Sequence, residues 1–312
     1  MRVLLATDGS GSAAIAAELV KNIRWPQGSS IDVIRVVGEP SLEGIVGPWP
    51  LGLPTPPALE ATEVADAEDA LLVTVQPLSK LGLKTAHAVL RGRPADAILE
   101  WIEGHRPDLV VVGTRADSEL TQALVGSVSA ELVDRSPVPV LVARRPTLQR
   151  VVVAVDGSDI ASRAVATVRR WPFLAAATIR VLSVAPAPVM WWPDEVRVGG
   201  PERPTHDRDA AADVLSEHDT IAAEAAARLC AAGFQAHSEV RAGSPAPTIV
   251  AFANEWQADL VIMGSHARTG VARVLLGSVA RNVLHHASGS VLVVRQHADP
   301  VRGRRLEAVS LR

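Results

Sequence analysis

The chain alternates between short apolar runs and longer alanine-rich stretches. The runs 31–37, 109–112 and 138–142 are rich in valine, leucine and isoleucine, which indicates strands buried in a sheet. The alanine-rich stretches 58–81 and 207–232 predict helices. Because strands alternate with helices, the pattern predicts βαβ units, with a parallel sheet covered by helices on both faces. We therefore expect a three-layer α/β sandwich.

This pattern occurs twice along the chain. Four segments return in the same order and at nearly the same spacing: VLLATDGS (3–10) as VVVAVDGS (151–158), RWP (24–26) as RWP (170–172), DLVVVGT (108–114) as DLVIMGS (259–265), and ALVGSVSAELV (123–133) as VLLGSVARNVL (274–284). Such self-similarity indicates a duplication. The sequence predicts two tandem sandwiches, each with a mostly parallel five-stranded sheet, at 1–147 and 148–298, followed by a polar tail at 299–312.

A proline-rich stretch follows the second strand of each copy, at 40–57 and 186–204. Proline removes a backbone donor, so these stretches are predicted to be long loops. Trp49, Trp191 and Trp192 lie in them, and we expect these rings to pin the loops to the sandwich more readily than to stack on a ligand.

Composition narrows the class of protein. Of the 312 residues 48% are apolar and 21% are charged, with a net charge of -3, which is typical of a globular chain. The lack of a basic cluster argues against a nucleic-acid binder. A single cysteine, Cys230, excludes an internal disulfide. It lies in an alanine-rich helical run, where we expect it to pack as a small apolar side chain. With no signal peptide or membrane span in view, we expect a cytoplasmic protein.

The segment 264–278 carries the strongest candidate chemistry. Ligands of open α/β sheets bind at the carboxyl ends of the strands, where this segment begins. Gly277 and Ser278 open a helix, whose free N–H groups and dipole attract phosphate, and Gly264 permits close backbone approach. His266 and Arg268 add positive charge. The structural alternative is that Gly264 merely ends a strand and Ser278 is the helix N-cap.

Asp8 and Asp156 precede a Gly-Ser pair at the start of a helix in each copy. A carboxylate there either contacts a ligand's ribose or accepts hydrogen bonds from the helix N–H groups. The residues alone leave both roles open.

The segment 264–278 resembles the G-x-x-G-(nine residues)-G-[ST] signature of the ATP-binding branch of the universal stress proteins. Three further features resemble the same family: VAVDGS after the first strand, GRPADAIL (92–99) with its counterpart GSPAPTIV (243–250), and the final strands VPVLVARR and SVLVVRQ. The resemblance covers both halves and implies the adenine nucleotide alpha hydrolase-like fold.

The resemblance also implies a site in each half. In the second half Asp156 would contact ribose, the Val184 backbone would contact adenine, and the phosphates would lie at the signature segment. The implied signature residues there are Gly264, Ser265, His266, Ala267, Arg268, Gly277, Ser278 and Val279. The corresponding residues of the first half are Asp8, Val36, Gly113, Ala116, Gly126, Ser127 and Val128.

Both copies depart from the signature at its second glycine, which is Ala116 in one and Ala267 in the other. If that position needs a positive φ, alanine costs about 1 kcal/mol. The first copy also carries Asp117 and Glu119, whose charges repel a triphosphate, so tighter binding is expected in the second half.

The resemblance implies a stress-response regulator or sensor that binds ATP or AMP, with or without Mg²⁺. We expect at most slow hydrolysis, because no general base or activated nucleophile accompanies the phosphates. The halves are expected to pair through their last strands, with 138–142 beside 290–294, and a homodimer is a further expectation. The alternative is a stress protein of the same fold that binds no nucleotide and acts through protein partners.

Four enzyme classes fit poorly. A Rossmann dehydrogenase is suggested by Gly9-Ser-Gly11, which follows a predicted strand. The second copy lacks this motif, and no acidic residue ends the second strand at the required distance. A P-loop kinase or ATPase needs a lysine directly after a glycine, and none of the lysines has one. His285 and His286 are adjacent on a predicted helix, so they diverge and suit zinc poorly. A G-x-S-x-G nucleophile turn is missing from the sequence.

Overall fold

The computed structural model places most of the chain in regular elements. It describes residues 1–38, 57–114, 125–186, 205–265 and 276–295. Trp49, Trp191 and Trp192, and the polar tail, lie outside these ranges.

Each half contains five strands and four α-helices within the described residues. The first half comprises β1 (Arg2–Ala6), α1 (Gly11–Asn22), β2 (Ser30–Val37), α2 (Pro57–Ser79), β3 (Lys84–Arg91), α3 (Pro94–His105), β4 (Leu109–Gly113), α4 (Ser127–Arg135) and β5 (Val140–Ala143). The second half comprises β6 (Arg150–Val155), α5 (Asp159–Arg169), the 3₁₀ helix η2 (Pro172–Leu174), β7 (Thr178–Ala185), α6 (Thr205–Cys230), β8 (Gln235–Ala242), α7 (Pro245–Glu255), β9 (Leu260–Ser265), α8 (Ser278–His286) and β10 (Ser290–Arg295). The predicted alternation of strands and helices is confirmed.

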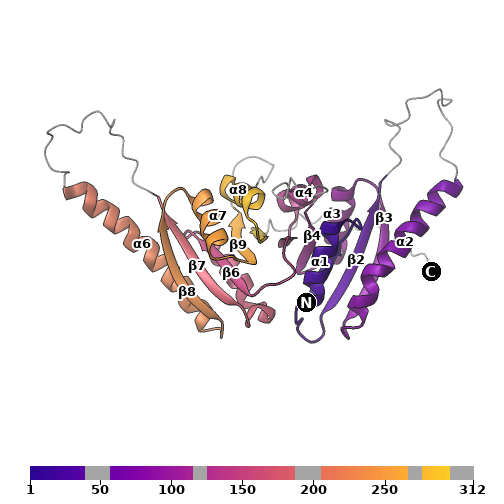
Figure 1. Cartoon of the computed structure of the whole chain (residues 1–312), viewed down its shortest axis with the longest axis horizontal. Helices are drawn as coiled ribbons and strands as arrows, with labels where there is room; N and C mark the ends of the chain where they lie inside the picture. The colour runs from indigo at the N-terminus through magenta and orange to yellow at the C-terminus, as the bar shows by residue number, and fades with distance from the viewer. Residues whose placement is uncertain (39–56, 115–124, 187–204, 266–275, 296–312) are drawn as a thin grey trace, which may run out of the picture.

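All ten strands form one sheet, in the order β3-β2-β1-β4-β5-β10-β9-β6-β7-β8. Strands within each half are parallel, as predicted. The two halves meet where β5 and β10 pair antiparallel, with Leu141 opposite Leu292, which confirms the predicted pairing through the last strands. Figure 1 shows the resulting arrangement, with the long helices α2 and α6 at the outer ends and α4 and α8 near the centre.

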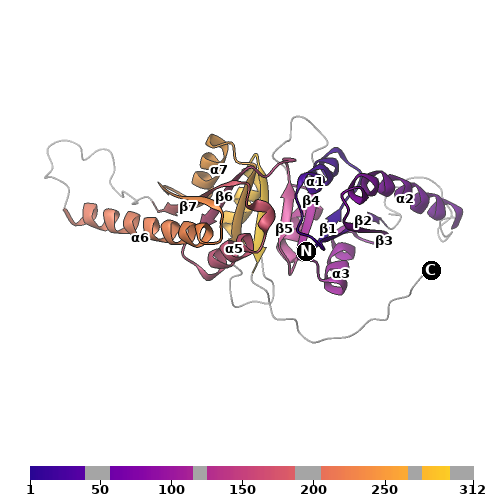
Figure 2. The ribbon, with the colours of Figure 1, turned by 90° about the horizontal axis from the view of Figure 1, so that it is seen from below.

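Helices cover the sheet on both faces and complete the three layers. In each half, helices lie on both sides of the sheet (Figure 2). Buried residues of α1, α2, α5 and α6 belong to one apolar core, and those of α3, α4, α7 and α8 belong to the other. Two apolar cores result, and each runs through both halves without a break at the β5–β10 junction. The repeated RWP segments meet at this junction, since the ring of Trp25 lies 5.1 Å from that of Phe173. The joined sheet therefore holds the halves together by apolar packing as well as by strand pairing.

Two arginines at corresponding positions cross the junction in opposite directions. The Arg144 guanidinium donates to the carbonyl of Leu284, in the last turn of α8, at 2.5 Å, and to that of Gly289 at 3.3 Å. Arg295 donates to the carbonyl of Val133, in the last turn of α4, at 3.1 Å. A cation at a helix C-terminus is favourable because the dipole is negative there. Burial lowers the pKa of Arg144 to about 10, so its side chain remains protonated at pH 7.

Replacing this cation tests the junction. Arg144→Ala removes two donors from carbonyls in a half-buried setting, and we expect it to lower the free energy of unfolding by about 2 kcal/mol. Arg145→Ala is the matched control, because its neighbouring side chain is exposed, and we expect a change within about 0.5 kcal/mol. Urea denaturation followed by circular dichroism measures both. Equal stabilities for the two variants would contradict the conclusion that the Arg144 contacts stabilise the junction.

One smaller expectation is wrong. Cys230 is exposed at the end of α6, where its thiol donates to the carbonyl of Ala236 at 3.2 Å, so it does not pack as a small apolar side chain. The buried stripe of α6 runs through Ala222, Ala225 and Leu229 and leaves the next position outside. In the described part of the chain, no helix is both long enough and apolar enough to cross a membrane.

Candidate functional site

The expected site residues of the second half gather at the carboxyl edge of three neighbouring strands. β6 lies between β7 and β9, so the chain leaves β6 toward one side and returns on the other. Ligands of doubly wound sheets bind at such a switch point. Asp156 follows β6, Val184 is near the end of β7, and Gly264 is near the end of β9. The first half repeats this arrangement with β2, β1 and β4.

Asp156 shapes the start of α5. Its Oδ1 accepts from the backbone N–H of Ser158 at 3.0 Å and from the hydroxyl of Ser158 at 2.5 Å. Ser158 is the helix N-cap and accepts from the N–H of Ala161. The intervening Gly157 has φ +78°, which explains the glycine in this turn. Asp156 is exposed, so the carboxylate also faces solvent at the sheet edge.

The first half builds the same turn. Asp8 Oδ1 accepts from the N–H of Ser10 at 2.9 Å, and Ser10 caps α1. Of the two roles that the sequence left open, the structure therefore supplies the helix-start role for both aspartates. Ribose contact remains a prediction.

Val184 lies near the end of β7, which extends beyond its neighbour β6, and Val36 lies near the end of β2, which extends beyond β1. The ladder between β6 and β7 ends at Val155 opposite Ser183, whereas the ladder between β7 and β8 continues to Ala185. The Val184 side chain packs into a core, so only its backbone is available toward the switch point. Val36 has the same placement in β2.

Gly264 and Gly113 are glycines for a packing reason. A Cβ on Gly264 would lie 2.8 Å from Cγ1 and 2.9 Å from the backbone carbon and oxygen of Ile160, in the first turn of α5. A Cβ on Gly113 would lie 2.5 Å from the backbone of Ser12 in α1. Close contact between helix and strand therefore accounts for both glycines without a ligand, whereas the sequence suggested ligand approach.

Gly277 forms the N-cap of α8, and the helix begins at Ser278, so the structural alternative in which Ser278 is the cap is wrong. A glycine has no side chain that could accept from the first helical N–H groups, so this N-cap residue makes no side-chain bond to them. Ser278 is the exposed first helical residue, and Val279 packs partly against the core. Ser265, which is 2% exposed, accepts from the Gly277 N–H at 3.2 Å and so fixes the turn from β9.

The first half has the same uncapped helix start. Gly126 is the N-cap of α4 without a side-chain bond, followed by exposed Ser127 and half-buried Val128. His266, Ala267, Arg268 and Ala116 lie outside the described residues. Their predicted phosphate contacts, and the effect of the two alanines, stay predictions.

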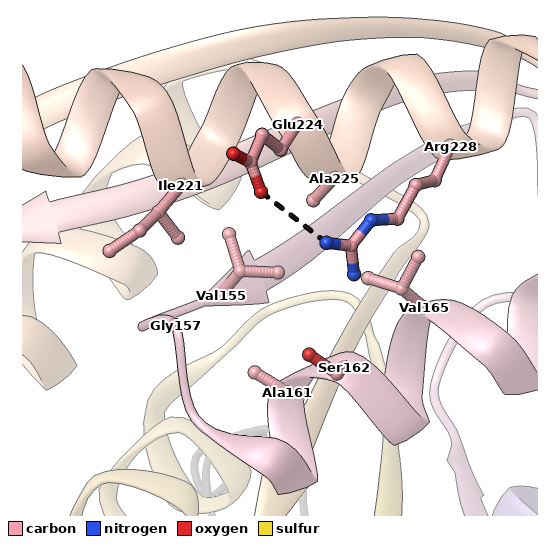
Figure 3. Close-up of a pocket in the computed structure, with 9 residues that line it drawn as sticks. All are labelled: Val155, Gly157, Ala161, Ser162, Val165, Ile221, Glu224, Ala225 and Arg228. Atoms are coloured by element: carbon pink, nitrogen blue, oxygen red, sulfur yellow. Dashed lines mark hydrogen bonds and ion pairs between the residues drawn. The ribbon is translucent and has the colours of Figure 1, made fainter.

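A cavity of about 140 Å³ opens beside the Asp156 turn, between α5 and α6 (Figure 3). Its lining comes from the end of β6, from α5 and from α6: Val155, Gly157, Ala161, Ser162, Val165, Ile221, Glu224, Ala225 and Arg228. Glu224 and Arg228, one turn apart on α6, form an ion pair at 3.3 Å on the α6 side of the cavity. Because ligand pockets usually measure about 300–1,000 Å³, this cavity is too small for a whole nucleotide.

The two halves differ beside this turn. In the second half Ile221 approaches Gly157, and β7 carries the short Ser183, whose hydroxyl lies 2.8 Å from Nδ1 of His218. In the first half the position that corresponds to Ser183 is Arg35, whose Nη1 lies 3.0 Å from where a Cβ of Gly9 would be. Arg35 therefore brings a positive charge to the Asp8 turn. The sequence alone does not indicate this contact, because Arg35 lies within a mostly apolar strand.

The doubly wound sheet, the paired switch points and the glycine N-caps of α4 and α8 define a tandem α/β protein with two corresponding strand-end edges. A family model described as "Universal stress protein family" matches residues 1–144 and 147–295. The chain therefore belongs to the universal stress protein family.

Several members of this family are similar to the chain. It is 34% identical to Universal stress protein Rv2005c of Mycobacterium tuberculosis over 203 residues, which is 61% of this chain and 62% of that protein. It is 26% identical to Universal stress protein E homolog of Haemophilus influenzae, over 67% and 69% of the two chains. A 64-residue stretch is 47% identical to Universal stress protein MJ0531 of Methanocaldococcus jannaschii and spans 38% of that protein.

Solved structures show the same fold. A universal stress protein from Archaeoglobus fulgidus superposes with a TM-score of 0.64 at 22% identity, over 94% of this chain and 98% of its own. One from Pseudomonas aeruginosa gives a TM-score of 0.60 at 18% identity, over 94% and 92%. At these identities the similarity establishes the architecture only.

Proposed function

We propose that this universal stress protein binds an adenine nucleotide and acts as a stress-response regulator or sensor. The observation that carries the proposal is the glycine N-cap of α8 at a switch point, because Gly277 itself offers no side-chain acceptor to the first helical N–H groups. A phosphate there gains hydrogen bonds and a favourable interaction with the helix dipole. The exposed Asp156 and the projecting Val184 backbone lie at the same sheet edge, in reach of a ribose and an adenine.

The proposal assigns the main site to the second of two domains, 1–147 and 148–298. Gly264 and Ser265 support the turn, Ser278 and Val279 supply N–H groups, and His266 and Arg268 add charge. The first half has a weaker site at its corresponding residues, with Asp8 and Gly126 at its centre. ATP is the expected ligand, AMP is the alternative, and Mg²⁺ would accompany a triphosphate.

The proposed role is regulatory. A ligand that binds only the folded state stabilises it, by about 2.7 kcal/mol at a hundredfold excess over Kd. Nucleotide level would thereby be linked to the order of the site and to the affinity for protein partners. Hydrolysis, if it occurs, is expected to be slow, and the cytoplasm is the proposed location.

Calorimetric titration of ATP with Mg²⁺ into the wild type and Gly277→Asp tests the site. Aspartate is a preferred N-cap, and Gly277 has φ −59° and ψ 150°, so the variant is expected to keep α8 folded. Its carboxylate would take the free N–H groups and repel phosphate. We expect a loss of affinity of roughly 100-fold, since like charges in contact cost several kcal/mol.

Two matched variants complete this experiment. Gly277→Asn caps the helix without charge and should weaken binding less than Gly277→Asp. Gly126→Asp makes the same change in the first half and should leave the main site intact. If the wild type gives no binding heat, the nucleotide proposal is wrong, and the partner-binding alternative, which the alanines at 116 and 267 leave open, takes its place.

A further inference from the structure

A carboxylate of the first half lies at the start of the proposed phosphate helix of the second half. Asp134, in the last turn of α4, accepts from the backbone N–H of Leu276 through Oδ1 at 3.1 Å. Leu276 directly precedes the N-cap Gly277 of α8 and is 7% exposed. The same Oδ1 lies 3.4 Å from Nη2 of Arg281, in the first half of α8. One side chain therefore contacts the beginning of α8 at two points across the junction.

The start of α8 is fixed from both sides. The Leu276 N–H is bound by Asp134 of the first half, and the next N–H, of Gly277, is bound by Ser265 of its own half. Two consecutive backbone donors with fixed partners restrict the peptide orientation before the helix. The uncapped N–H groups that follow are thereby aimed in one direction. Loss of the Asp134 contact would leave this turn held by Ser265 alone.

Asp134 is poorly suited to its own helix. A carboxylate in the last turn of a helix lies at the negative end of the dipole, which is unfavourable. The contacts to Leu276 and Arg281, and the nearby positive charge of Arg295, offset this cost. The contacts that stabilise Asp134 thus come from the second half.

The arrangement is not reciprocal. The positions that correspond to Asp134, Leu276 and Arg281 by the internal repeat are His285, Val125 and Ala130. An imidazole replaces the carboxylate there, and alanine replaces its cationic partner. Burial, and after it the nearby positive charges, lower the pKa of His285, which favours its neutral form. A carboxylate of the first half therefore contacts the second half, whereas the corresponding position of the second half, His285, carries no carboxylate.

We propose that Asp134 is a positioning residue for the nucleotide site of the second half, and that this site is complete only when the two halves are paired. The inference rests on the proposed function for its ligand, but the orientation of the α8 start is a separate property. The Asp134 contact also gives a structural reason, besides the charges at 117 and 119, to expect tighter binding in the second half.

The test uses the full chain with Gly126→Asp, so that ATP binding reports on the second half alone. In this background Asp134→Ala is expected to raise Kd for ATP with Mg²⁺ about tenfold, the equivalent of one hydrogen bond. Asp134→Asn keeps an Oδ1 acceptor for the Leu276 N–H and should restore Kd to within about threefold of the parent. Glu131→Ala is the control, because this α4 carboxylate pairs with Arg93 and Arg135 of its own half.

Hydrogen exchange of the Leu276 and Gly277 amides, measured without nucleotide, provides the second readout. We expect exchange at Leu276 to be about tenfold faster in Asp134→Ala and close to the parent rate in Asp134→Asn and Glu131→Ala. Unchanged exchange in Asp134→Ala overturns the inference. Equal loss of affinity in the alanine and asparagine variants also overturns it, because charge rather than positioning would then be responsible.

The two proposals fail in different ways. Absence of ATP binding in the unsubstituted chain overturns the nucleotide function, while amide exchange still decides whether Asp134 orients the start of α8. If Asp134→Ala does not fold, the asparagine variant decides the matter: a slow Leu276 amide supports positioning by hydrogen bonding, and a fast one contradicts it.

Discussion

Gly113→Ala is expected to lower the free energy of unfolding by about 3 kcal/mol, the upper end of the usual cost of overpacking. The added Cβ would lie 2.5 Å from the carbonyl carbon and oxygen of Ser12 and 2.7 Å from the N of Ala13. These are backbone atoms in the first turn of α1, so the clash cannot be relieved by rotating a side chain. The helix must move away from β4, which disrupts the core between them.

Gly264→Ala makes the corresponding change in the second half and is expected to cost about 2 kcal/mol. Its nearest contacts, to Ile160, are longer, at 2.8–2.9 Å, and one of the three atoms belongs to a side chain. A smaller movement of α5 therefore suffices. The order of the two effects is part of the prediction.

Gly11→Ala is the matched control in the first half. Gly11 opens α1, and an added Cβ there would meet no atom within 4 Å. We expect it to be neutral or to stabilise by up to about 1 kcal/mol, since alanine restricts the unfolded chain. Urea denaturation of the three variants measures the differences. If Gly113→Ala were as stable as Gly11→Ala, close packing would not be the reason for the glycine.

These glycines also illustrate what the sequence predicts and what it does not. The repeat placed Gly113 and Gly264 at the carboxyl ends of strands, and the structure has them there. Their physical role depends on how closely α1 and α5 approach the sheet, which no local pattern specifies. Similarly, Gly-Ser at 277–278 predicted a helix start, but the identity of the N-cap depends on backbone angles.

The sheet was more predictable than the contacts across its centre. Apolar runs and the internal repeat sufficed for two parallel five-stranded units, and the family resemblance added the pairing of their last strands. The contacts of Arg144, Arg295 and Asp134 join residues about 140–160 positions apart, so their partners follow only from the antiparallel register of β5 and β10. A signal was present, because Arg144 and Arg295 occupy the same place in the repeat.

The β5–β10 junction also determines how the two halves behave when they are separated. A second half expressed alone, residues 148–298, is expected to form a homodimer through β10. Without β5 the strand becomes an edge with unpaired N–H and C=O groups, and the apolar core around Leu292 loses its continuation around Leu141. Pairing with another copy is the available way to cover both.

Mixing the two separated halves is expected to replace homodimers by a one-to-one complex. In a homodimer of the second half, His285 takes the place of Asp134 opposite Leu276 and Arg281, so the cation loses its carboxylate partner. In a homodimer of the first half, Asp134 faces Val125 and Ala130 and has no such cation opposite. Only the mixed pair brings Asp134 and Arg281 together.

Native mass spectrometry of the halves, alone and mixed, measures this preference, with Asp134→Ala in the first half as the control. We expect the mixed complex to dominate for the parent halves and to approach the statistical proportion in the control. A second half that stays monomeric and fully stable would mean that β10 needs no partner. A mixed complex that is insensitive to Asp134→Ala would mean that strand pairing and the arginine contacts alone select the partner, since those contacts to backbone carbonyls are available in every combination.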